Sequence, residues 1–354
     1  EKDEEVKRFL DAAVAQADLD FEAFEFGLRA VVLSAGARLL ESLLARVGRG
    51  RRTNPVICAC GKRMASRGLG KKRIRTILGD ITFSRSSFEC PGCGATRFPG
   101  DEDLDIAGTG FSPGVQKLMA RAGSRSTFKE SRDDLKIYAE ISVDAKDVER
   151  VAEGVGREIE LWEKKQRDTA MNAPVPLPIR KDIPIMYVSY DGTGVPMVPW
   201  EVAGRKGKQA DGSARTREVK LGCVFTQTKT DDEGFPIRDD ESTSFTGAIE
   251  GAEEFGWRIY GEARNRGIDR AVTVVVLGDG AVWVWNIAET HFHGAFQIVD
   301  LYHARQHLYE LCRIVGNGDD RIRNRCQIQW LTYLDDGKIE TIATRANALL
   351  PKSG

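Results

Sequence analysis

Four cysteines in one short stretch could bind a metal ion. Cys58 and Cys60 form a C-x-C pair, and Cys90 and Cys93 form a C-x-x-C pair further along the chain. Each pair is followed directly by a glycine, which allows backbone N–H groups to point at sulfur. Four thiolates complete a tetrahedral Zn²⁺ site and leave no open position, so the pattern predicts a structural zinc ion. Four reduced structural cysteines are the alternative.

Three aspartates are the candidates for a second kind of metal chemistry. Asp191 in "SYDGTG", Asp279 in "LGDGA" and Asp300 in "IVDLYH" each follow an apolar run and are expected to end a strand. Strand-terminal acids on neighbouring strands meet at one edge of a sheet, where their repulsion favours a bound cation. Oxygen ligands select a hard ion such as Mg²⁺, and two such ions can clamp an in-line phosphoryl displacement. This is the ribonuclease H-like arrangement; turn residues are the alternative.

Basic residues and one histidine extend this prediction towards DNA. His303 follows Asp300 by three residues and could place an imidazole beside the metal pair, or simply begin a helix. Basic residues cluster from Gly61 to Gly79 and from Trp200 to Lys220, where they suit phosphate contact or form solvated surfaces. The candidate DNA contacts are Lys62, Arg63, Lys71, Lys72, Arg73, Lys146, Arg150, Arg205, Lys206 and Lys208.

The elements that must position these residues fall into five segments of a multidomain α+β protein. Residues 1–52 are predicted to be helical, 53–100 a zinc ribbon, 101–171 a helix-turn-helix region and 172–184 a proline-rich linker. Residues 185–354 are predicted to form a ribonuclease H-like α/β domain with a mixed sheet and the start of a helical insertion. The first helix carries one apolar stripe, which we expect to be buried in the core or, as the second choice, in a dimer seam. Its residues are Phe21, Phe24, Leu28, Val32, Ala35, Leu39 and Leu43.

Length predicts two or three domains, and composition is typical of a soluble globular protein. The chain has 354 residues, of which 41% are hydrophobic and 30% charged, with a net charge of −1. No apolar run is long enough to span a bilayer, so no membrane association is expected. The near-neutral charge excludes a uniformly basic nucleic-acid-binding protein.

Four motifs together resemble a known family. "YVSYDGTGVPMV", "GRKGKQADGSARTREVKLGCVFTQ", "VLGDGAVWVWNIAE" and "IVDLYHARQHLYEL" are similar to segments of the DDE transposases of the Kra group of bacterial insertion sequences, relatives of the Mutator-like transposases. The resemblance implies DNA cleavage and joining with Mg²⁺ or Mn²⁺, with Asp191 and Asp279 as the first two catalytic acids. Asp300 and His303 match the Asp/Cys-x-x-His element of the family.

The third acid of such families is a Glu in a Gly-Ser-Gly-containing motif, which this sequence lacks. Glu310 is the nearest substitute, and the expected glutamate would lie beyond Gly354, after a helical insert that starts near Asp319. The resemblance further implies double-stranded DNA as partner, a homodimer or higher oligomer, and a bacterial cytoplasmic, nucleoid-associated location. Two alternatives stay open: a truncated or domesticated transposase that only binds DNA, and a ribonuclease H-like nuclease.

Overall fold

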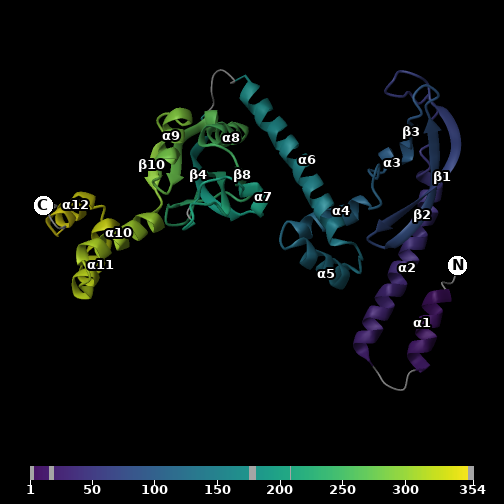
Figure 1. The fold of residues 1–354 in the computed structure, drawn as a ribbon, viewed down its shortest axis with the longest axis horizontal. Helices are drawn as coiled ribbons and strands as arrows, with labels where there is room; N and C mark the ends of the chain where they lie inside the picture. The colour runs from purple at the N-terminus through teal and green to yellow at the C-terminus, as the bar shows by residue number, and fades with distance from the viewer. Residues whose placement is uncertain (1–3, 16–19, 175–180, 208, 350–354) are drawn as a thin grey trace. The chain divides into compact units, whose positions relative to one another are not determined.

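A long helix, α6 (Ala145–Asn172), contains the boundary between two units of the chain, residues 1–161 and 162–354. The structure is a computed structural model that describes residues 4–15, 20–174, 181–207 and 209–349 (Figure 1). The fold is mixed α+β, as the sequence predicts. Residues 175–180 of the predicted linker and the candidate DNA contact Lys208 lie outside the described residues.

In the first unit, helices lie before and after a three-stranded sheet. The elements are α1 (Glu4–Ala15), α2 (Phe21–Val47), β1 (Ala65–Thr76), β2 (Gly79–Glu89), β3 (Thr96–Arg97), α3 (Pro99–Asp103), α4 (Pro113–Gly123) and α5 (Phe128–Ala139), followed by α6. The strands β1 and β2 form an antiparallel hairpin whose last pair is Thr76 with Gly79. The turn is therefore Ile77–Leu78, two residues before Gly79-Asp80, where the sequence pattern predicts it. Gly79 has a φ of +125°, which disfavours any other residue there.

Helix α2 packs on this hairpin through a different face from the predicted one. Ala37, Leu40 and Leu44 of α2 join Ile81 and other hairpin residues in one hydrophobic cluster. The predicted stripe is instead exposed to solvent. Five of its seven members are exposed, by 75% for Phe21, 44% for Leu28, 57% for Val32, 72% for Leu39 and 53% for Leu43, whereas Phe24 and Ala35 are half-buried. The expectation that this stripe is buried in the core of the chain was wrong.

The segment from Thr127 to Glu160 predicts two short helices with a break at 140–143. The first is α5, which begins with the capping box that Thr127 and Glu130 predict, and the break follows it, but the second helix, α6, is long. Ser112 caps the preceding helix α4 by accepting a hydrogen bond from the N–H of Val115. The three helices share a core that includes the fully buried Met119 and Val148.

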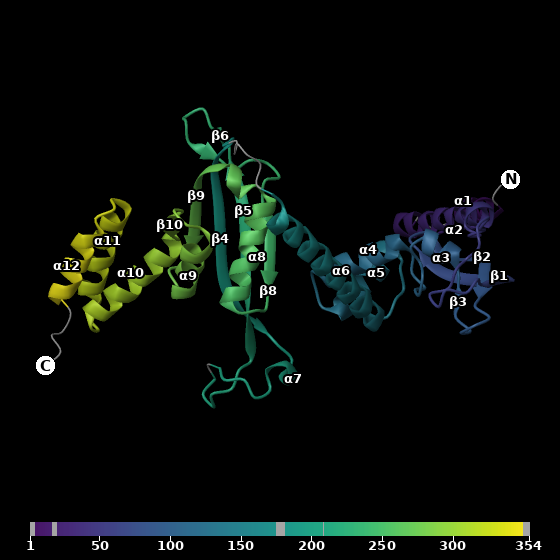
Figure 2. The ribbon, with the colours of Figure 1, turned by 90° about the horizontal axis from the view of Figure 1, so that it is seen from above.

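The second unit is built on a five-stranded mixed sheet with the order β10-β9-β4-β5-β8 (Figure 2). Its strands are β4 (Ile183–Pro196), β5 (Thr216–Gln227), β8 (Ser244–Ala248), β9 (Ala271–Gly278) and β10 (Phe296–Val299). The central strand β4 is parallel to β9 and antiparallel to β5, and β10 is parallel to β9. The minor strands β6 (Lys229–Thr230) and β7 (Pro236–Ile237) form a separate pair, and α7 (Pro199–Val202) follows β4.

Two helices, α8 (Ala252–Asn265) and α9 (Val282–His291), cover one face of this sheet. Met186, Val188 and Tyr190 of β4 point into that core, as does Val276 of β9. Because side chains alternate along a strand, the residues between them face the opposite side of the sheet. The register and this alternation decide where the candidate acids lie.

The chain continues from the sheet into three helices. They are α10 (Leu301–Gly316), α11 (Asp320–Asp335) and α12 (Ile339–Leu349). Earlier in the chain, a short 3₁₀ helix, η1 (Ile268–Arg270), precedes β9. Their shared core surrounds the buried Trp330, which agrees with the helical segment predicted from Asp319 onwards. Among the described residues, no helix is both long enough and apolar enough to cross a membrane.

A buried ion cluster joins the hairpin of the first unit to α3. The carboxylate of Asp101 accepts hydrogen bonds from Nζ of Lys72 at 3.0 Å and from Nε of Arg85 at 2.8 Å, and Asp101 is 4% exposed. Arg85 also lies over the ring of Phe98. Both cations depend on this one carboxylate for charge compensation.

We expect Asp101→Asn to destabilise the first unit by about 3–5 kcal/mol, because it leaves two buried cations without their counter-charge. Asp103→Asn is the matched control, since Asp103 pairs with the more exposed Arg52 and its loss should cost about 0–1 kcal/mol.

Hydrogen exchange of the β1 and β2 amides, followed by mass spectrometry, measures this effect in the intact chain. All six tryptophans lie in the second unit, so tryptophan fluorescence should be unchanged. Equal protection of β1 and β2 in the two variants would contradict the proposed dependence on Asp101.

Candidate functional site: a four-cysteine centre and an acidic row

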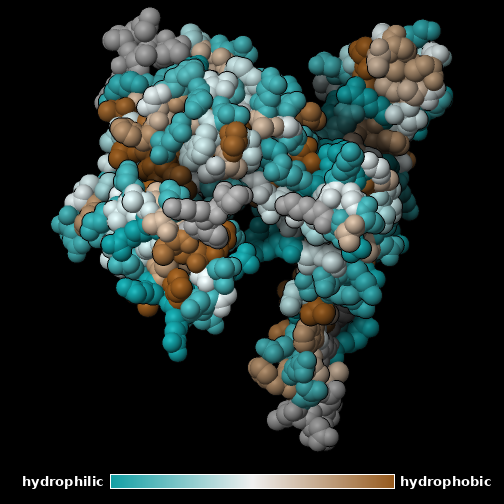
Figure 3. Space-filling view, turned by 60° about the vertical axis from the view of Figure 1, so that its left-hand side comes forward, coloured by the Kyte–Doolittle hydropathy of each residue, from teal (hydrophilic) through white to brown (hydrophobic). Residues whose placement is uncertain are grey.

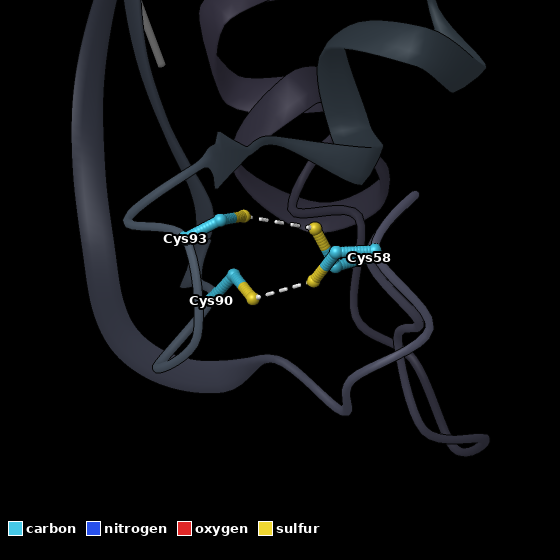
Figure 4. Close-up of side chains that lie close together, drawn as sticks. Cys58, Cys90 and Cys93 are labelled. Carbon is cyan, nitrogen blue, oxygen red and sulfur yellow. Dashed lines mark hydrogen bonds between the residues drawn. The ribbon is translucent and has the colours of Figure 1, made fainter.

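The four predicted zinc ligands lie together in the first unit. Their Sγ atoms are all within 4.8 Å of one another, and we call this group the four-cysteine centre. Sγ of Cys58 lies 3.5 Å from Sγ of Cys93, and Sγ of Cys60 lies 3.4 Å from Sγ of Cys90 (Figure 4). Zn–S bonds of about 2.3 Å require sulfur separations of about 3.8 Å, so the four thiols need little rearrangement to hold Zn²⁺.

Two tight turns present these thiols. The N–H of Gly61 donates to the carbonyl of Cys58, and the N–H of Gly94 donates to the carbonyl of Cys90. Gly61 and Gly94 have φ values of +82° and +73°, which explains the glycine after each pair. The N–H of Gly92 also donates to Sγ of Cys90 at 3.4 Å and lowers the pKa of that thiol to about 6. The turn therefore favours the thiolate form of Cys90, whereas contacts with the neighbouring thiols raise the pKa of Cys60 and of Cys93.

The three candidate aspartates of the second unit lie in one row across three parallel strands. The last registered pair of β4 and β9 is Ser189 with Leu277, and two residues further along are Asp191 and Asp279. Val299 of β10 pairs with Gly278, and the next residues are Asp300 and Asp279. The N–H of Asp300 donates to the carbonyl of Gly278 at 2.7 Å, which fixes this end of β10. We call Asp191, Asp279 and Asp300 the acidic row.

One detail of the predicted acids is corrected. Asp279 and Asp300 directly follow β9 and β10, as expected, but Asp191 lies inside β4 and does not end it. The strand continues to Pro196 because β5 still pairs with it there, after β9 has stopped. Asp191 thus lies just beyond the point at which the pairing of β4 with its parallel neighbour β9 ends.

Backbone register places Asp191 and Asp279 at the same level of the neighbouring strands β4 and β9. Neighbouring strands lie about 4.8 Å apart, so carboxylates at the same level can share an ion. Asp191 follows the buried Tyr190 and therefore faces away from α8 and α9. One oxygen of Asp191 accepts from the N–H of Gly192, and one of Asp279 from the N–H of Ala281. Within the described residues, the second oxygen of each carboxylate makes no hydrogen bond, which leaves it for a metal ion.

Asp300 and His303 form a cap at the start of α10. Oδ1 of Asp300 accepts from the N–H groups of Tyr302 and His303, and lies 3.4 Å from Nδ1 of His303. The N–H of His303 is the largest cause that lowers the pKa of this carboxyl, so Asp300 stays ionised beside the row. Glu310 is exposed on the same helix, about 10 Å further along the axis than His303. Oε2 of Glu310 lies 3.7 Å from Nδ1 of His307.

The predicted DNA contacts of the first unit differ in how available they are. Lys62, Arg63, Lys71 and Arg73 are exposed, and Lys146 and Arg150 lie on the outer face of α6 with exposed side chains. The ammonium group of Lys72 points inward and donates to Asp101 and to the carbonyl of Ile106, so it is not available to a DNA phosphate. The sequence pattern of the strand that contains Lys72 did not predict this inward orientation.

The basic segment of the second unit is a hairpin arm. Beyond Asp191, β4 and β5 remain paired as far as Pro196 with Thr216, and residues 192–215, which we call the arm, project from the sheet (Figure 2). Arg205 and Lys206 are exposed on it. A cleft of about 560 Å³ lies between the arm, β5 and the start of α8.

Two further basic residues line this cleft. Both belong to the basic segment from Trp200 to Lys220, but the sequence did not identify them as candidate DNA contacts. They are Arg217 and Lys220, which join Arg205 and Lys206 in the lining. Nε of Arg217 is buried and makes no hydrogen bond to any described residue. Lys220 is 5% exposed and donates to Glu218 at 2.6 Å. These residues share a cleft because β5 pairs with the arm, and this pairing cannot be predicted from amino-acid composition.

Comparisons with known proteins give no family for this chain. No protein family and no curated protein matches the sequence. Among solved structures, the Drosophila P element transposase strand transfer complex aligns at 10% identity and a TM-score of 0.26, over 55% of this chain and 43% of that chain. A crystal structure of a membrane protein from Pseudomonas aeruginosa aligns at 13% identity and a TM-score of 0.07, over 97% of this chain and 92% of that chain. Both TM-scores are too low to establish a shared fold.

We expect the purified chain to contain one zinc ion. The Cys90→Ser variant should contain at most about one tenth of that amount of zinc, because three thiolates leave one position of the tetrahedron open. Cys223→Ser is the control, since Cys223 lies in the second unit, outside the four-cysteine centre. Metal analysis by mass spectrometry after gel filtration measures the content. A wild-type chain that neither contains nor takes up zinc would contradict the assignment.

Proposed function

We propose that the protein is a DNA transposase that cleaves and joins DNA with divalent metal ions. The observation that carries the proposal is the acidic row, in which Asp191, Asp279 and Asp300 occupy one level of three parallel strands. The order and directions of the five strands support a ribonuclease H-like domain, as the sequence resemblance implies. The resemblance to transposases of the Kra group supplies the reaction type.

In this proposal Asp191 and Asp279 hold two Mg²⁺ or Mn²⁺ ions through their outward-facing carboxylates. The ions would activate the attacking oxygen and stabilise the leaving oxygen of a DNA phosphodiester. The cap formed by Asp300 and His303 fixes the start of α10 next to the row and keeps an imidazole close to it. The glutamate that the resemblance implies as the third catalytic acid is outside the proposal.

The basic surfaces would hold the DNA. Arg205 and Lys206 of the arm, with Arg217, are basic residues of a cleft that Glu218 and Glu250 also line, and they are proposed to contact phosphates. Phosphate contacts bind DNA without regard to its sequence. The helix-turn-helix, with Lys146 and Arg150 exposed on α6, and the four-cysteine centre with Lys62 and Arg63 are proposed to bind the element's ends. Zinc at that centre would be structural.

We expect Asp191→Asn and Asp279→Asn each to weaken Mn²⁺ binding by at least about 100-fold, because each removes a charged ligand. Asp232→Asn, in the exposed turn between β6 and β7, should leave binding unchanged. Electron paramagnetic resonance of free Mn²⁺ in a titration of the intact chain gives the affinity. Equal affinities for all three variants would remove the metal site from the acidic row.

An assay with DNA from the flanks of the reading frame separates the functions. Metal-dependent strand joining that is lost in Asp279→Asn supports a transposase. Cleavage without joining would indicate a ribonuclease H-like nuclease instead, and binding without either would indicate a DNA-binding protein with an incomplete active site.

We expect the double variant Arg205→Ala with Lys206→Ala to bind DNA of any sequence more weakly and with a smaller dependence on salt. Each lost phosphate contact should lower the slope of log affinity against log salt by about 0.9, so the pair should lower it by about 1–2. Lys229→Ala, on the exposed strand β6, is the control. Fluorescence anisotropy at several salt concentrations measures both values, and an unchanged slope would rule out phosphate contact by the arm.

A further inference from the structure

The solvent-facing side of α2 is apolar along most of its length. At 100° per residue, Phe21, Leu28, Val32, Leu39 and Leu43 fall within about 60° of one another, and they span about 33 Å. We call these five residues the exposed stripe. They remain 44–75% exposed while the other face of α2 packs on the β1–β2 hairpin. Brown and tan surface is visible on the projecting α1–α2 hairpin at the lower right of Figure 3.

A helix that is apolar on both faces is normally buried on both faces. Contiguous apolar surface of this kind on a folded protein marks an interaction site. The first unit covers one face of α2, so the second face requires another partner. We propose that this partner is a second copy of the same chain, bound through the same stripe in antiparallel orientation.

The spacing of the exposed stripe makes it complementary to itself. In an antiparallel pairing about a two-fold axis, Leu28 lies opposite Leu43 of the partner subunit, and Val32 lies opposite Leu39 of the partner subunit. Because the axis exchanges the two copies, each pair occurs twice. The axis passes near Ala35, whose small side chain allows the two helices to approach closely.

Two charged residues on the same arc as the exposed stripe select the antiparallel direction. At 100° per residue, Glu25 falls at the angle of Leu43 and Arg46 at that of Leu28. The same pairing sets Glu25 opposite Arg46 of the partner subunit, and both residues are exposed. A parallel pairing would set Glu25 against Glu25 and Arg46 against Arg46, which places like charges together. The acidic start and basic end of α2 therefore favour the antiparallel dimer.

Sedimentation equilibrium of the intact chain tests the proposal. We expect a species of twice 39.2 kDa that dissociates on dilution. Val32→Glu with Leu39→Glu should weaken the dimer by at least about 100-fold, because four charges enter an apolar seam. Ile314→Glu with Ile328→Glu is the matched control, since both residues are exposed on the helices α10 and α11 and should have no effect. Circular dichroism and zinc content report whether each variant is folded.

A charge exchange tests the direction. Glu25→Arg and Arg46→Glu should each weaken the dimer by about three- to tenfold, and the double variant should restore it. A double variant as weak as either single variant would overturn the antiparallel register. A chain that stays monomeric at the highest concentration, or a dimer unaffected by glutamates at 32 and 39, would overturn the assignment of the stripe to a second copy.

Discussion

The parallel register of β4, β9 and β10 is the constraint on which the candidate active site depends. Backbone pairing aligns Ser189 with Leu277 and Gly278 with Val299, and this alone brings three aspartates from distant parts of the sequence to one level. A slip of one residue in either strand pair would turn a carboxylate to the opposite face of the sheet. The core under α8 and α9, which includes Val188 and Val276, opposes such a slip because it would expose that core.

The first unit is stabilised in a different way. Its hairpin is long and strongly charged, and much of β1 is exposed, so few apolar contacts support it. The four-cysteine centre closes one end of the hairpin, and the cluster of Asp101, Lys72 and Arg85 joins it to α3. Buried charge pairing and the packed cysteines therefore add to the hydrophobic cluster that α2 forms with the hairpin.

Local patterns in the sequence predicted the elements but not all of their environments. The four cysteines, the capping box at Thr127 and the order of strands and helices around Asp279 follow from short-range chemistry, and all were found. The exposure of the α2 stripe, the inward turn of Lys72 and the passage of β4 beyond Asp191 were not foreseen. Each of these three features depends on which distant segment packs against the residue. Sequence periodicity indicates only that one face of a helix is apolar or that side chains alternate along a strand.

The continuity of β4 has a mechanical consequence. The strand that carries Asp191 is also one side of the arm, and the ladder with β5 runs unbroken from Gln227 to Thr216. A hydrogen-bonded two-stranded ribbon is stiff along its length, so a load applied at the base of the arm, where Pro196 pairs with Thr216, is passed along β4 to the level of Asp191. Such a load would act on the strand that carries Asp191 and not directly on β9 and β10, which precede Asp279 and Asp300.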